Sequence, residues 1–345
     1  MTIASTMRAW QYSSNGGGIT PNLRLNTNAA VPTVKASKEM LIRVLAVGLN
    51  PVDHRPAESI LYPFAISKPA TPGTDFAGEV VQGPANDLFQ KGDVVFGSAK
   101  NIFAGGMLAD YGIANTDHAI SIGPLSPTDA AAIPIAGLTA YQSIFPRIKP
   151  NRRIFINGGS GGTGTFGIQI AKAMGHKVTV SCSSRNAELC RSLGAEVIDY
   201  TEGLLLHDLK EAAKVRKFDL VLDNVFTNPE LYWKAHEYTS EGAPYIVLPF
   251  NMTASFMVPF LSMKLLPRFM GGGQRTLTQI FGQPKLEQLE QIRDWVTEKR
   301  VKVVLDQVVP FEQTKQAFER LTSGRTVGKI VVGVAEASAT KSKSV

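Results

Sequence analysis

Cysteine is nearly absent from this sequence: only Cys182 and Cys190 occur among 345 residues. Two cysteines cannot form the disulfide framework of a small secreted protein. The sequence therefore predicts a reducing compartment, which we expect to be the cytoplasm. Two cysteines are also too few for a structural zinc site with four cysteine ligands. The composition argues against a fold held together by disulfides or by structural zinc.

Long hydrophobic segments are also missing. Residues 1–6 lack the apolar core of a signal peptide. The most lipophilic stretch, residues 256–270, is too short to span a bilayer and contains Pro259, Lys264 and Pro267. We expect this stretch to cover a ligand pocket or a subunit interface rather than to lie on a membrane surface, and we expect no stable membrane insertion.

Basic residues are in excess but are not clustered. The net charge is +7, yet no basic run interleaved with aromatic residues is present, which argues against nucleic-acid binding. A positive field of this kind attracts an anionic cofactor, although plain surface solvation explains it equally well. With 44% hydrophobic and 19% charged residues the composition is that of an ordinary globular protein, and the length predicts two domains.

Two patterns divide the chain. The first part has short strand-like runs separated by Gly, Pro and Asp, which predict a β-rich barrel. These runs are residues 7–10, 40–49, 72–81, 91–97 and 105–111. From Pro127 helix and strand alternate, which predicts a parallel, doubly wound sheet. The helices are expected at 129–133 and, with an amphipathic pattern, at 137–144, and the buried strands at 154–156, 178–181, 218–224 and 243–249.

The end of the chain returns to the first domain in this reading. An amphipathic helix at 286–299 is followed by strands at 301–309 and 329–334, with no crossover pattern between them. The first domain is thus discontinuous and comprises residues 1–126 and 284–345, and the second comprises 127–283. The predicted fold class is α/β, with one barrel domain and one doubly wound domain.

A glycine loop stands at the centre of the second domain. The spacing of Gly159, Gly161 and Gly164 is G-x-G-x-x-G, with Ser160, Gly162 and Thr163 between them. The loop lies where a strand becomes a helix, inside a complete β-α-β unit. Glycines allow the backbone to approach a pyrophosphate, and the free amides at the helix N-terminus favour its negative charge. The sequence predicts a dinucleotide site here.

These segments resemble the medium-chain dehydrogenase/reductase superfamily, and in particular its zinc-independent quinone oxidoreductase branch, to which zeta-crystallin belongs. The matching segments are residues 50–53 (Asn-Pro-Val-Asp), 72–81, 92–97, 137–142, 157–173, 218–225 and 328–332. The resemblance implies a GroES-like barrel interrupted by a Rossmann domain, a nicotinamide cofactor and a homodimer formed by edge-to-edge pairing of Rossmann sheets. It also points to a fungal enoyl reductase of secondary metabolism.

The residues at the metal positions depart from the alcohol dehydrogenases of the superfamily. Those enzymes hold a catalytic zinc through cysteine and histidine, and have Gly-His-Glu where this chain has Gly73-Thr74-Asp75. Asp53 and His54 are adjacent and have no further partners for a tetrahedral site. We therefore expect no metal, and without a Lewis acid the easier chemistry is hydride transfer to an alkene conjugated to a carbonyl.

Five polar residues are candidates for the catalytic site: Asn50, Asp53, His54, Tyr62 and Thr139. The resemblance places residues 50–62 beside the nicotinamide and substrate. Each has a structural alternative: Asp53 is equally suited to cap the following helix, and Tyr62 to pack between its apolar neighbours. His54 is expected to be an exposed loop residue.

The cofactor is predicted to be NADPH. Ser183, at the end of the second strand, replaces the carboxylate that NAD-specific proteins place there, so no acidic group repels a 2′-phosphate. Ser183 and Ser184 supply hydroxyl donors, and Arg185 supplies a cation. By resemblance, Tyr200 is a second phosphate contact, Asn224 lies at the cofactor, and Lys329 lies on a C-terminal loop near it.

The sequence as a whole favours an NADPH-dependent reductase of a small apolar enone or quinone. The alternative is a catalytically silent protein that keeps the cofactor fold, in the way that crystallin-like members serve as structural proteins. Asn50 and Asp53 favour the enzyme.

Overall fold

The computed structural model describes residues 3–14, 16–58, 66–85, 88–99, 106–226, 228–248 and 254–335. The chain divides into two compact units. Unit 1 comprises Met1–Ile135, Pro284–Thr297 and Leu305–Val345, and unit 2 comprises Ala136–Gln283 and Glu298–Val304. Whether the units are independent domains with the boundaries expected from the sequence stays a prediction.

Unit 2 is built on a six-stranded sheet in which all neighbours are parallel. The strand order is β10-β9-β8-β11-β12-β13. Numbered along the chain this is 3-2-1-4-5-6, the order of the doubly wound dinucleotide-binding fold. The strands are β8 Arg153–Asn157, β9 Lys177–Cys182, β10 Glu196–Asp199, β11 Leu220–Asp223, β12 Pro244–Val247 and β13 Thr276–Gln279.

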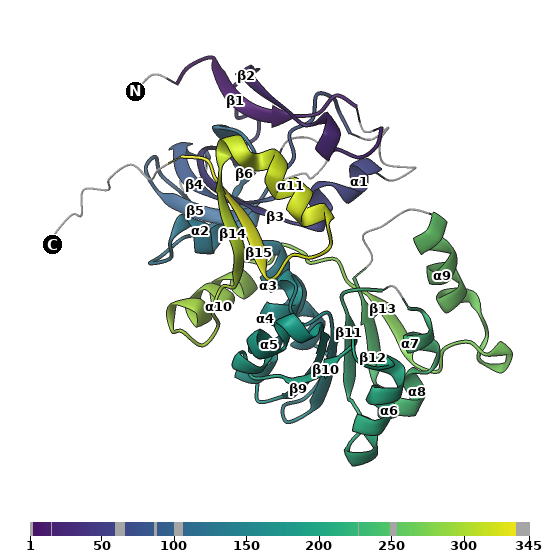
Figure 1. Cartoon of the computed structure of the whole chain (residues 1–345). Coiled ribbons are helices and arrows are strands. Elements are labelled where there is room, and N and C mark those ends of the chain that lie inside the picture. The colour runs from purple at the N-terminus through teal and green to yellow at the C-terminus, as the bar shows by residue number, and fades with distance from the viewer. Residues whose placement is uncertain are drawn as a thin grey trace. The chain divides into compact units, whose positions relative to one another are not determined.

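Alternate residues of these strands point into two separate cores, one on each face of the sheet. Ile154 and Ile156 of β8 pack with α3, α4 and α5, whereas Phe155 packs with α6, α8 and α9 (Figure 1). The doubly wound architecture expected from the sequence is confirmed. The helices of this region are α3 Pro134–Ile144, α4 Gly162–Ala173, α5 Ala187–Ser192, α6 Leu205–Val215, α7 Glu230–Trp233, α8 Ala235–Tyr238 and α9 Ala254–Leu265, with short 3-10 turns η5 Ser184–Asn186 and η6 Arg268–Met270.

One local expectation for this unit is wrong, and two strands were not expected. Helix α3 is not amphipathic, because all its residues are buried except Ile135 and Gln142, which are partly buried. Strands β10 and β13 were not predicted, since each has only four residues and neither has an uninterrupted apolar run. The lipophilic stretch forms α9 and η6, where Phe260 and Met263 join the core and Leu265 and Phe269 stay 72% and 87% exposed.

Unit 1 contains a two-stranded sheet, β1-β2, and a seven-stranded sheet with the order β14-β15-β3-β4-β5-β7, in which β6 also pairs with β3. Its core is one cluster dominated by apolar residues of β3, β4 and β15. The strands are β1 Thr6–Gln11, β2 Arg24–Ala30, β3 Glu39–Leu49, β4 Asp75–Gln82, β5 Val94–Ser98, β6 Tyr111–Asn115, β7 Ala119–Ser121, β14 Leu305–Pro310 and β15 Lys329–Gly333.

The helices of unit 1 lie at its connections. They are α1 Arg55–Glu58, α2 Pro127–Ala131, α10 Leu286–Thr297 and α11 Thr314–Thr322, with 3-10 turns η1 Thr20–Asn22, η2 Pro51–Asp53, η4 Thr116–His118 and η7 Phe311–Gln313. The strand expected at 105–111 begins only at Tyr111. Among the described residues, no helix combines the length and the apolar character needed to cross a membrane.

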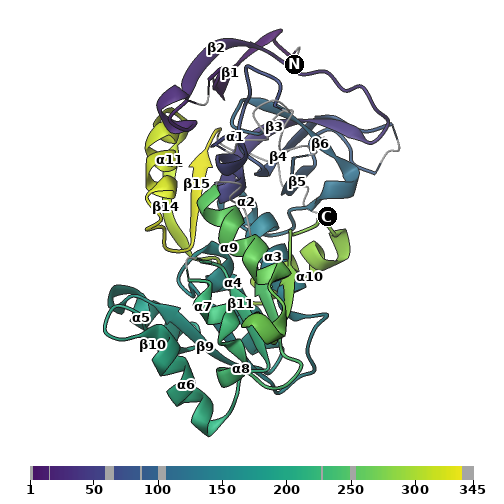
Figure 2. The same cartoon turned by 90° about the vertical axis from the view of Figure 1, so that its right-hand side faces the viewer.

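The expectation that no crossover joins the last two strands is wrong. Strands β14 and β15 are parallel, and α11 connects them and packs on both (Figure 2). Helix α11 buries Thr314, Ala317 and Phe318, whereas Gln316, Glu319 and Thr322 are exposed. Strand β15 then pairs antiparallel with β3, with Ile330 opposite Leu49. This pairing places Lys329, the first residue of β15, at the carboxyl end of β3.

Candidate functional site

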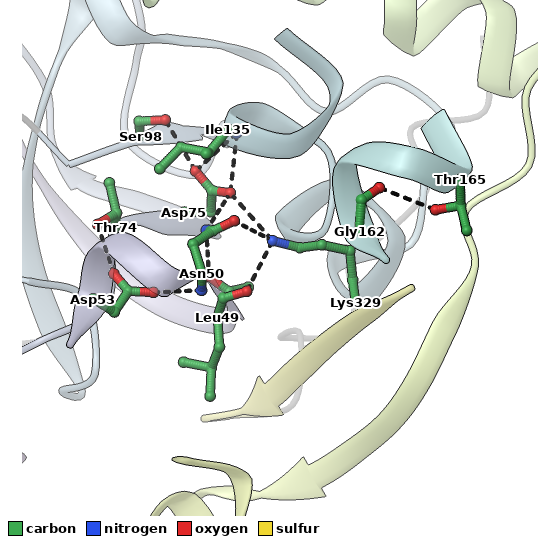
Figure 3. Close-up of polar contacts among 11 residues, drawn as sticks. Leu49, Asn50, Asp53, Thr74, Asp75, Ser98, Ile135, Gly162, Thr165 and Lys329 are labelled. Carbon is green, nitrogen blue, oxygen red and sulfur yellow. Dashed lines mark hydrogen bonds and ion pairs between the residues drawn. The ribbon is translucent and has the colours of Figure 1, made fainter. Parts of the chain in front are cut away.

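A group of buried polar side chains lies at the carboxyl end of β3 in unit 1 (Figure 3). We call it the buried polar cluster; it consists of Asn50, Asp53, Thr74, Asp75, Ser98 and Lys329. Residues of β3–η2, β4, β5 and β15 meet here because these strands are neighbours in one sheet. The sequence predicts Asn50 and Asp53 as site residues, and the structure brings both into this cluster.

The side-chain amide of Asn50 is held on both sides. Its Oδ1 accepts a hydrogen bond from the Lys329 Nζ at 2.5 Å, and its Nδ2 donates to Asp75 Oδ2 at 2.8 Å and to Gly48 O at 3.2 Å. A side-chain amide has two donor hydrogens, and both are therefore in use. Asn50 is also only 3% exposed. Its side chain positions the loop after β3 and offers no free donor to a bound molecule.

Asp75 accepts hydrogen bonds on both carboxylate oxygens. Ser98 donates to Oδ1 at 3.1 Å, and the Ile135 amide contacts both oxygens at 3.1 and 3.2 Å. Complete burial raises the pKa of Asp75 to about 6, while the Lys329 ammonium, 3.8 Å away, and the Asn50 amide act in the opposite direction. A carboxylate that only accepts hydrogen bonds is the ionised form, so Asp75 carries a buried negative charge at neutral pH.

Asp53 forms the second carboxylate of the cluster. Its Oδ1 accepts a hydrogen bond from the Thr74 hydroxyl, and its Oδ2 accepts one from the backbone N–H of Asn50, both at 2.6 Å. Burial raises its pKa, and these two hydrogen bonds lower it. Asp53 thus closes the turn of η2, the capping role considered from the sequence. The Tyr12 phenol, not anticipated from the sequence, has its pKa raised to about 12 by burial and then by the Asp53 charge.

Lys329 is the counter-ion of both carboxylates. It lies in β15 rather than on a loop, is 3% exposed, and donates to Leu49 O at 2.9 Å as well as to Asn50. Burial lowers the pKa of Lys329, and the charges of Asp75 and Asp53 raise it. Its ammonium is engaged inside unit 1, whereas its predicted contact with the cofactor stays a prediction.

The remaining candidates from the sequence are Thr139, Tyr62 and His54. Thr139 lies in α3, is buried, and its carbonyl accepts from the Ser143 hydroxyl at 2.7 Å. Tyr62 lies outside the described residues. His54 was expected to be exposed, but it is only 7% exposed because η2 turns it inward, and its Nδ1 lies 3.0 Å from Glu58 Oε1.

The glycine loop of unit 2 connects β8 to α4 at the carboxyl end of the sheet. Gly158 has φ of +82°, and a Cβ on Gly164 would lie 2.2 Å from the Gly158 carbonyl oxygen, so both positions require glycine within the protein itself. A Cβ on Gly161 would meet nothing closer than 3.8 Å. The absence of a side chain at Gly161 therefore leaves room for a group bound outside the loop.

A network beneath the loop, which the sequence reasoning missed, fastens it to the strands. The Gly158 amide donates to the Ser181 hydroxyl at 3.0 Å, Ser181 donates to Asn157 Oδ1 at 2.6 Å, and Asn157 Nδ2 donates to Asp223 Oδ1 at 2.8 Å. Tyr245 also donates to Asp223, at 2.8 Å. The sequence signal that could have predicted this network is the polar residue at or near the end of each strand: Asn157, Ser181 and Asp223.

Two buried polar side chains beside this loop have no hydrogen-bond partner in the described part of the chain. They are the hydroxyl of Ser183, just after β9, and both amide atoms of Asn224, just after β11. A buried polar group without a partner costs free energy, so such groups mark places where a ligand completes the bonding. Strands β8 and β11 flank the point where strand order reverses, which is where this fold binds nucleotides. The residues present fit a dinucleotide.

The other predicted cofactor residues lie at the same edge. The Ser160 hydroxyl accepts from Asn186 at 3.1 Å, and Gly162 and Thr163 form the first turn of α4. Arg185 and Tyr200 are exposed on the loops after β9 and β10, and Ser184 lies beside Thr201 at 3.0 Å. A carboxylate lies on the neighbouring loop: Ser184 Oγ lies 3.0 Å from Thr201 Oγ1, which lies 2.6 Å from Asp199 Oδ1. The expectation that no acidic group repels a 2′-phosphate here stays a prediction.

Comparison with known proteins agrees with both units. Residues 36–124 match the family model "Alcohol dehydrogenase GroES-like domain", and residues 193–332 match "Zinc-binding dehydrogenase". Among the described residues, however, no group of three His, Cys, Asp or Glu side chains is placed to hold a metal ion.

Two relatives match nearly the whole chain. A trans-enoyl reductase, pgmF, of Aspergillus terreus is 41% identical over 97% of this chain and 98% of its own. A chloroplastic quinone-oxidoreductase homolog of Spinacia oleracea is 35% identical over 95% of this chain and 99% of its own. The solved quinone oxidoreductase of Coxiella burnetii has a TM-score of 0.82 and 27% identity, covering 95% of this chain and 99% of that one.

These matches define an oxidoreductase with a nicotinamide-binding fold. The chain belongs to the medium-chain dehydrogenase/reductase superfamily, among the quinone oxidoreductases and enoyl reductases.

Proposed function

We propose that the chain is an NADPH-dependent reductase, which transfers hydride to the C=C bond of an α,β-unsaturated carbonyl compound or to a quinone. The supporting observation is the set of unpartnered polar groups, Ser183 and Asn224, beside the glycine loop. The trans-enoyl reductase and quinone-oxidoreductase relatives supply the substrate class. Bound NADPH would supply the hydride.

The chain's own residues bind and orient in this proposal. The backbone amides at the N-terminus of α4 would bind the pyrophosphate. The side chains of Ser183 and Asn224 would form hydrogen bonds with polar groups of the cofactor. Asn50 and Asp53 hold the loop after β3 in place through the buried polar cluster. The proton returned to the substrate α-carbon would come from the Tyr62 phenol or from water.

We also propose that the reaction needs no zinc. Asn50 and Thr74, near the positions where zinc enzymes of the superfamily have ligands, instead bond to Asp75 and Asp53. Elemental analysis of the purified protein should give no stoichiometric zinc, and chelators should leave the activity unchanged. Activity that is lost to a chelator and restored by zinc would contradict this proposal and point to alcohol oxidation.

The proposed reaction is tested by NADPH consumption with a panel of substrates. We expect turnover with alkyl-substituted enones and benzoquinones, and far lower kcat/KM with saturated ketones of the same size, because these lack the conjugated carbon that accepts hydride without a Lewis acid. Tight NADPH binding with no turnover across the panel would support the silent, structural alternative. Preferential turnover of saturated ketones or alcohols would contradict the proposal.

Cofactor choice is tested at Arg185. Its guanidinium is exposed and contacts no carboxylate in the described residues, so it is available to a 2′-phosphate. Hydrogen bonds to a charged group contribute about 1.5–3 kcal/mol each, so Arg185→Ala should weaken NADPH binding roughly ten- to a hundredfold and leave NADH almost unchanged. Equal kcat/KM for the two cofactors in the unmodified protein would refute NADPH preference.

Three further proposals concern the setting of the protein. A homodimer would form through β13, which pairs only with β12 among the described strands and so presents a free edge there. Light scattering of the purified protein measures its oligomeric state directly.

A cytoplasmic location is proposed because Cys182 and Cys190 are both free. A role in secondary metabolism is proposed from the trans-enoyl reductase relative.

A further inference from the structure

The loops after β9 and β10 lie side by side at the edge of the unit 2 sheet. Asp199 pairs with Cys182 in the strand register, and the Tyr200 amide donates to Cys182 O at 3.3 Å. A short chain of side chains links the two loops. Thr201 Oγ1 lies 2.6 Å from Asp199 Oδ1 and 3.0 Å from Ser184 Oγ.

The direction of these hydrogen bonds follows from the number of protons. An ionised carboxylate only accepts, so Thr201 must donate its single hydroxyl hydrogen to Asp199. Thr201 then has no hydrogen left for Ser184, so Ser184 donates its single hydrogen to Thr201 or directly to the Asp199 carboxylate, whose pKa a hydrogen bond from Ser184 also lowers. The hydroxyl of Ser184 is thereby left as an acceptor toward any further partner. An acceptor suits a ribose 2′-hydroxyl, which can donate, and does not suit a 2′-phosphate, which needs donors.

The charge of Asp199 acts in the same direction. Hydrogen bonds from Thr201, first from its hydroxyl and then from its amide, lower the pKa of Asp199, so the carboxylate is ionised at neutral pH. Like charges repel, and an ionised group beside Ser184 disfavours a phosphate at that place. Arg185, on the same loop, favours the phosphate. The two residues therefore oppose each other.

We propose that Asp199 is a specificity-determining residue, which acts through Thr201 and Ser184 to reduce the preference for NADPH over NADH. The proposal rests on the nicotinamide-cofactor site of the proposed function. A purely local role for Asp199 is the alternative, because its Oδ1 also accepts from the Thr201 amide at 2.9 Å and closes a turn.

The test separates charge from turn geometry. Asp199→Asn keeps an oxygen that accepts from Thr201 and removes only the charge. Dissociation constants for NADPH and NADH are measured by titration calorimetry, which needs no turnover. Asp199→Asn should tighten NADPH binding roughly three- to tenfold and change NADH binding less than about twofold, as expected for removing one nearby like charge in a solvated site.

A second variant tests the hydroxyl chain. Thr201→Val keeps the shape of the side chain and frees the Ser184 hydrogen, so NADPH binding should again tighten and NADH binding should not. Glu211→Gln serves as the control, since it removes an exposed carboxylate of α6 that pairs with Lys214 and lies on another element. The control should change neither constant.

Each outcome decides a separate point. Unchanged NADPH affinity in Asp199→Asn, or equal weakening of both cofactors, would overturn the proposal and leave Asp199 a turn residue. Unchanged affinity in Thr201→Val would overturn the role of the hydroxyl chain. If the unmodified protein prefers NADH, the NADPH assignment fails, yet a shift toward NADPH in Asp199→Asn would still support the role of Asp199.

Discussion

Replacing Lys329 with methionine is expected to lower the free energy of unfolding by about 3–5 kcal/mol at pH 7, the usual cost of breaking a buried ion pair on one side. Lys329 is the cation that the structure places beside the buried carboxylates of Asp75 and Asp53. Without its ammonium the charge of Asp75 is left unpaired in a site with no exposure. Equilibrium denaturation in urea measures the loss.

This loss should depend on pH with a definite sign. Burial raises the pKa of Asp75 to about 6 in the folded protein, against an ordinary value of 3.8. The folded state therefore binds more protons than the unfolded state between these values, and the stability contributed by Asp75 falls as the pH rises through that window. Removing Lys329 raises the pKa of Asp75 further, so the deficit of the variant should be small near pH 4 and grow as the pH rises through 6.

Two variants control this prediction. Lys302→Met removes an exposed lysine and should change stability by no more than about 0.5 kcal/mol. The double variant Asp75→Asn, Lys329→Met removes both charges and should recover most of the loss at pH 7. If Lys329→Met costs less than about 1 kcal/mol at every pH, or if the double variant recovers nothing, the ion pair is not the reason for the effect.

Adding one methyl group at Gly161 is expected to weaken NADPH binding roughly tenfold or more, because the second glycine of this loop lets the backbone approach the pyrophosphate. Stability should stay within about 0.5 kcal/mol, since φ at Gly161 is −77° and the new Cβ meets nothing within 3.8 Å. Titration calorimetry and urea denaturation of Gly161→Ala measure the two quantities.

Gly164→Ala provides the matched comparison in the same loop. Its Cβ would lie 2.2 Å from the Gly158 carbonyl oxygen, so the backbone must move and stability should fall by about 1–3 kcal/mol, as for other overpacked sites. The two variants thus separate a ligand contact from internal packing. Gly161→Ala with unchanged NADPH affinity would show that no phosphate group approaches the loop at that residue.

Much of unit 2 was predictable because its signals are local. The glycine loop, the strand before it and the helix after it lie within residues 153–173, and the strands at 177–182 and 220–223 are rich in β-branched and apolar residues. The short strands β10 and β13 escaped prediction, since Thr276–Gln279 is largely polar and pairs with β12 on one side only. Their strand character comes from pairing rather than from composition.

The candidate site was predictable in its residue types but not in its contacts. The sequence singled out Asn50 and Asp53, and the structure brings both into one buried cluster, whereas their roles in the reaction stay predictions. Nothing in the sequence shows that Lys329, 279 positions from Asn50, donates to the side-chain amide oxygen of Asn50. The proposed role of Asp199 was missed for a similar reason: the contacts among Asp199, Thr201 and Ser184 join the loops that follow two neighbouring strands. Spacing along the chain carries no information on such contacts.

The position of Lys329 in β15 has a consequence for synthesis on the ribosome. Asp53 and Asp75 are synthesised before Lys329, the cation that pairs with them, and more than 250 residues separate Asp75 from Lys329. At typical elongation rates the interval is on the order of tens of seconds. During that time β3 lacks its β15 neighbour, and the two carboxylates must stay hydrated. The barrel unit can therefore close only after β15 has been synthesised.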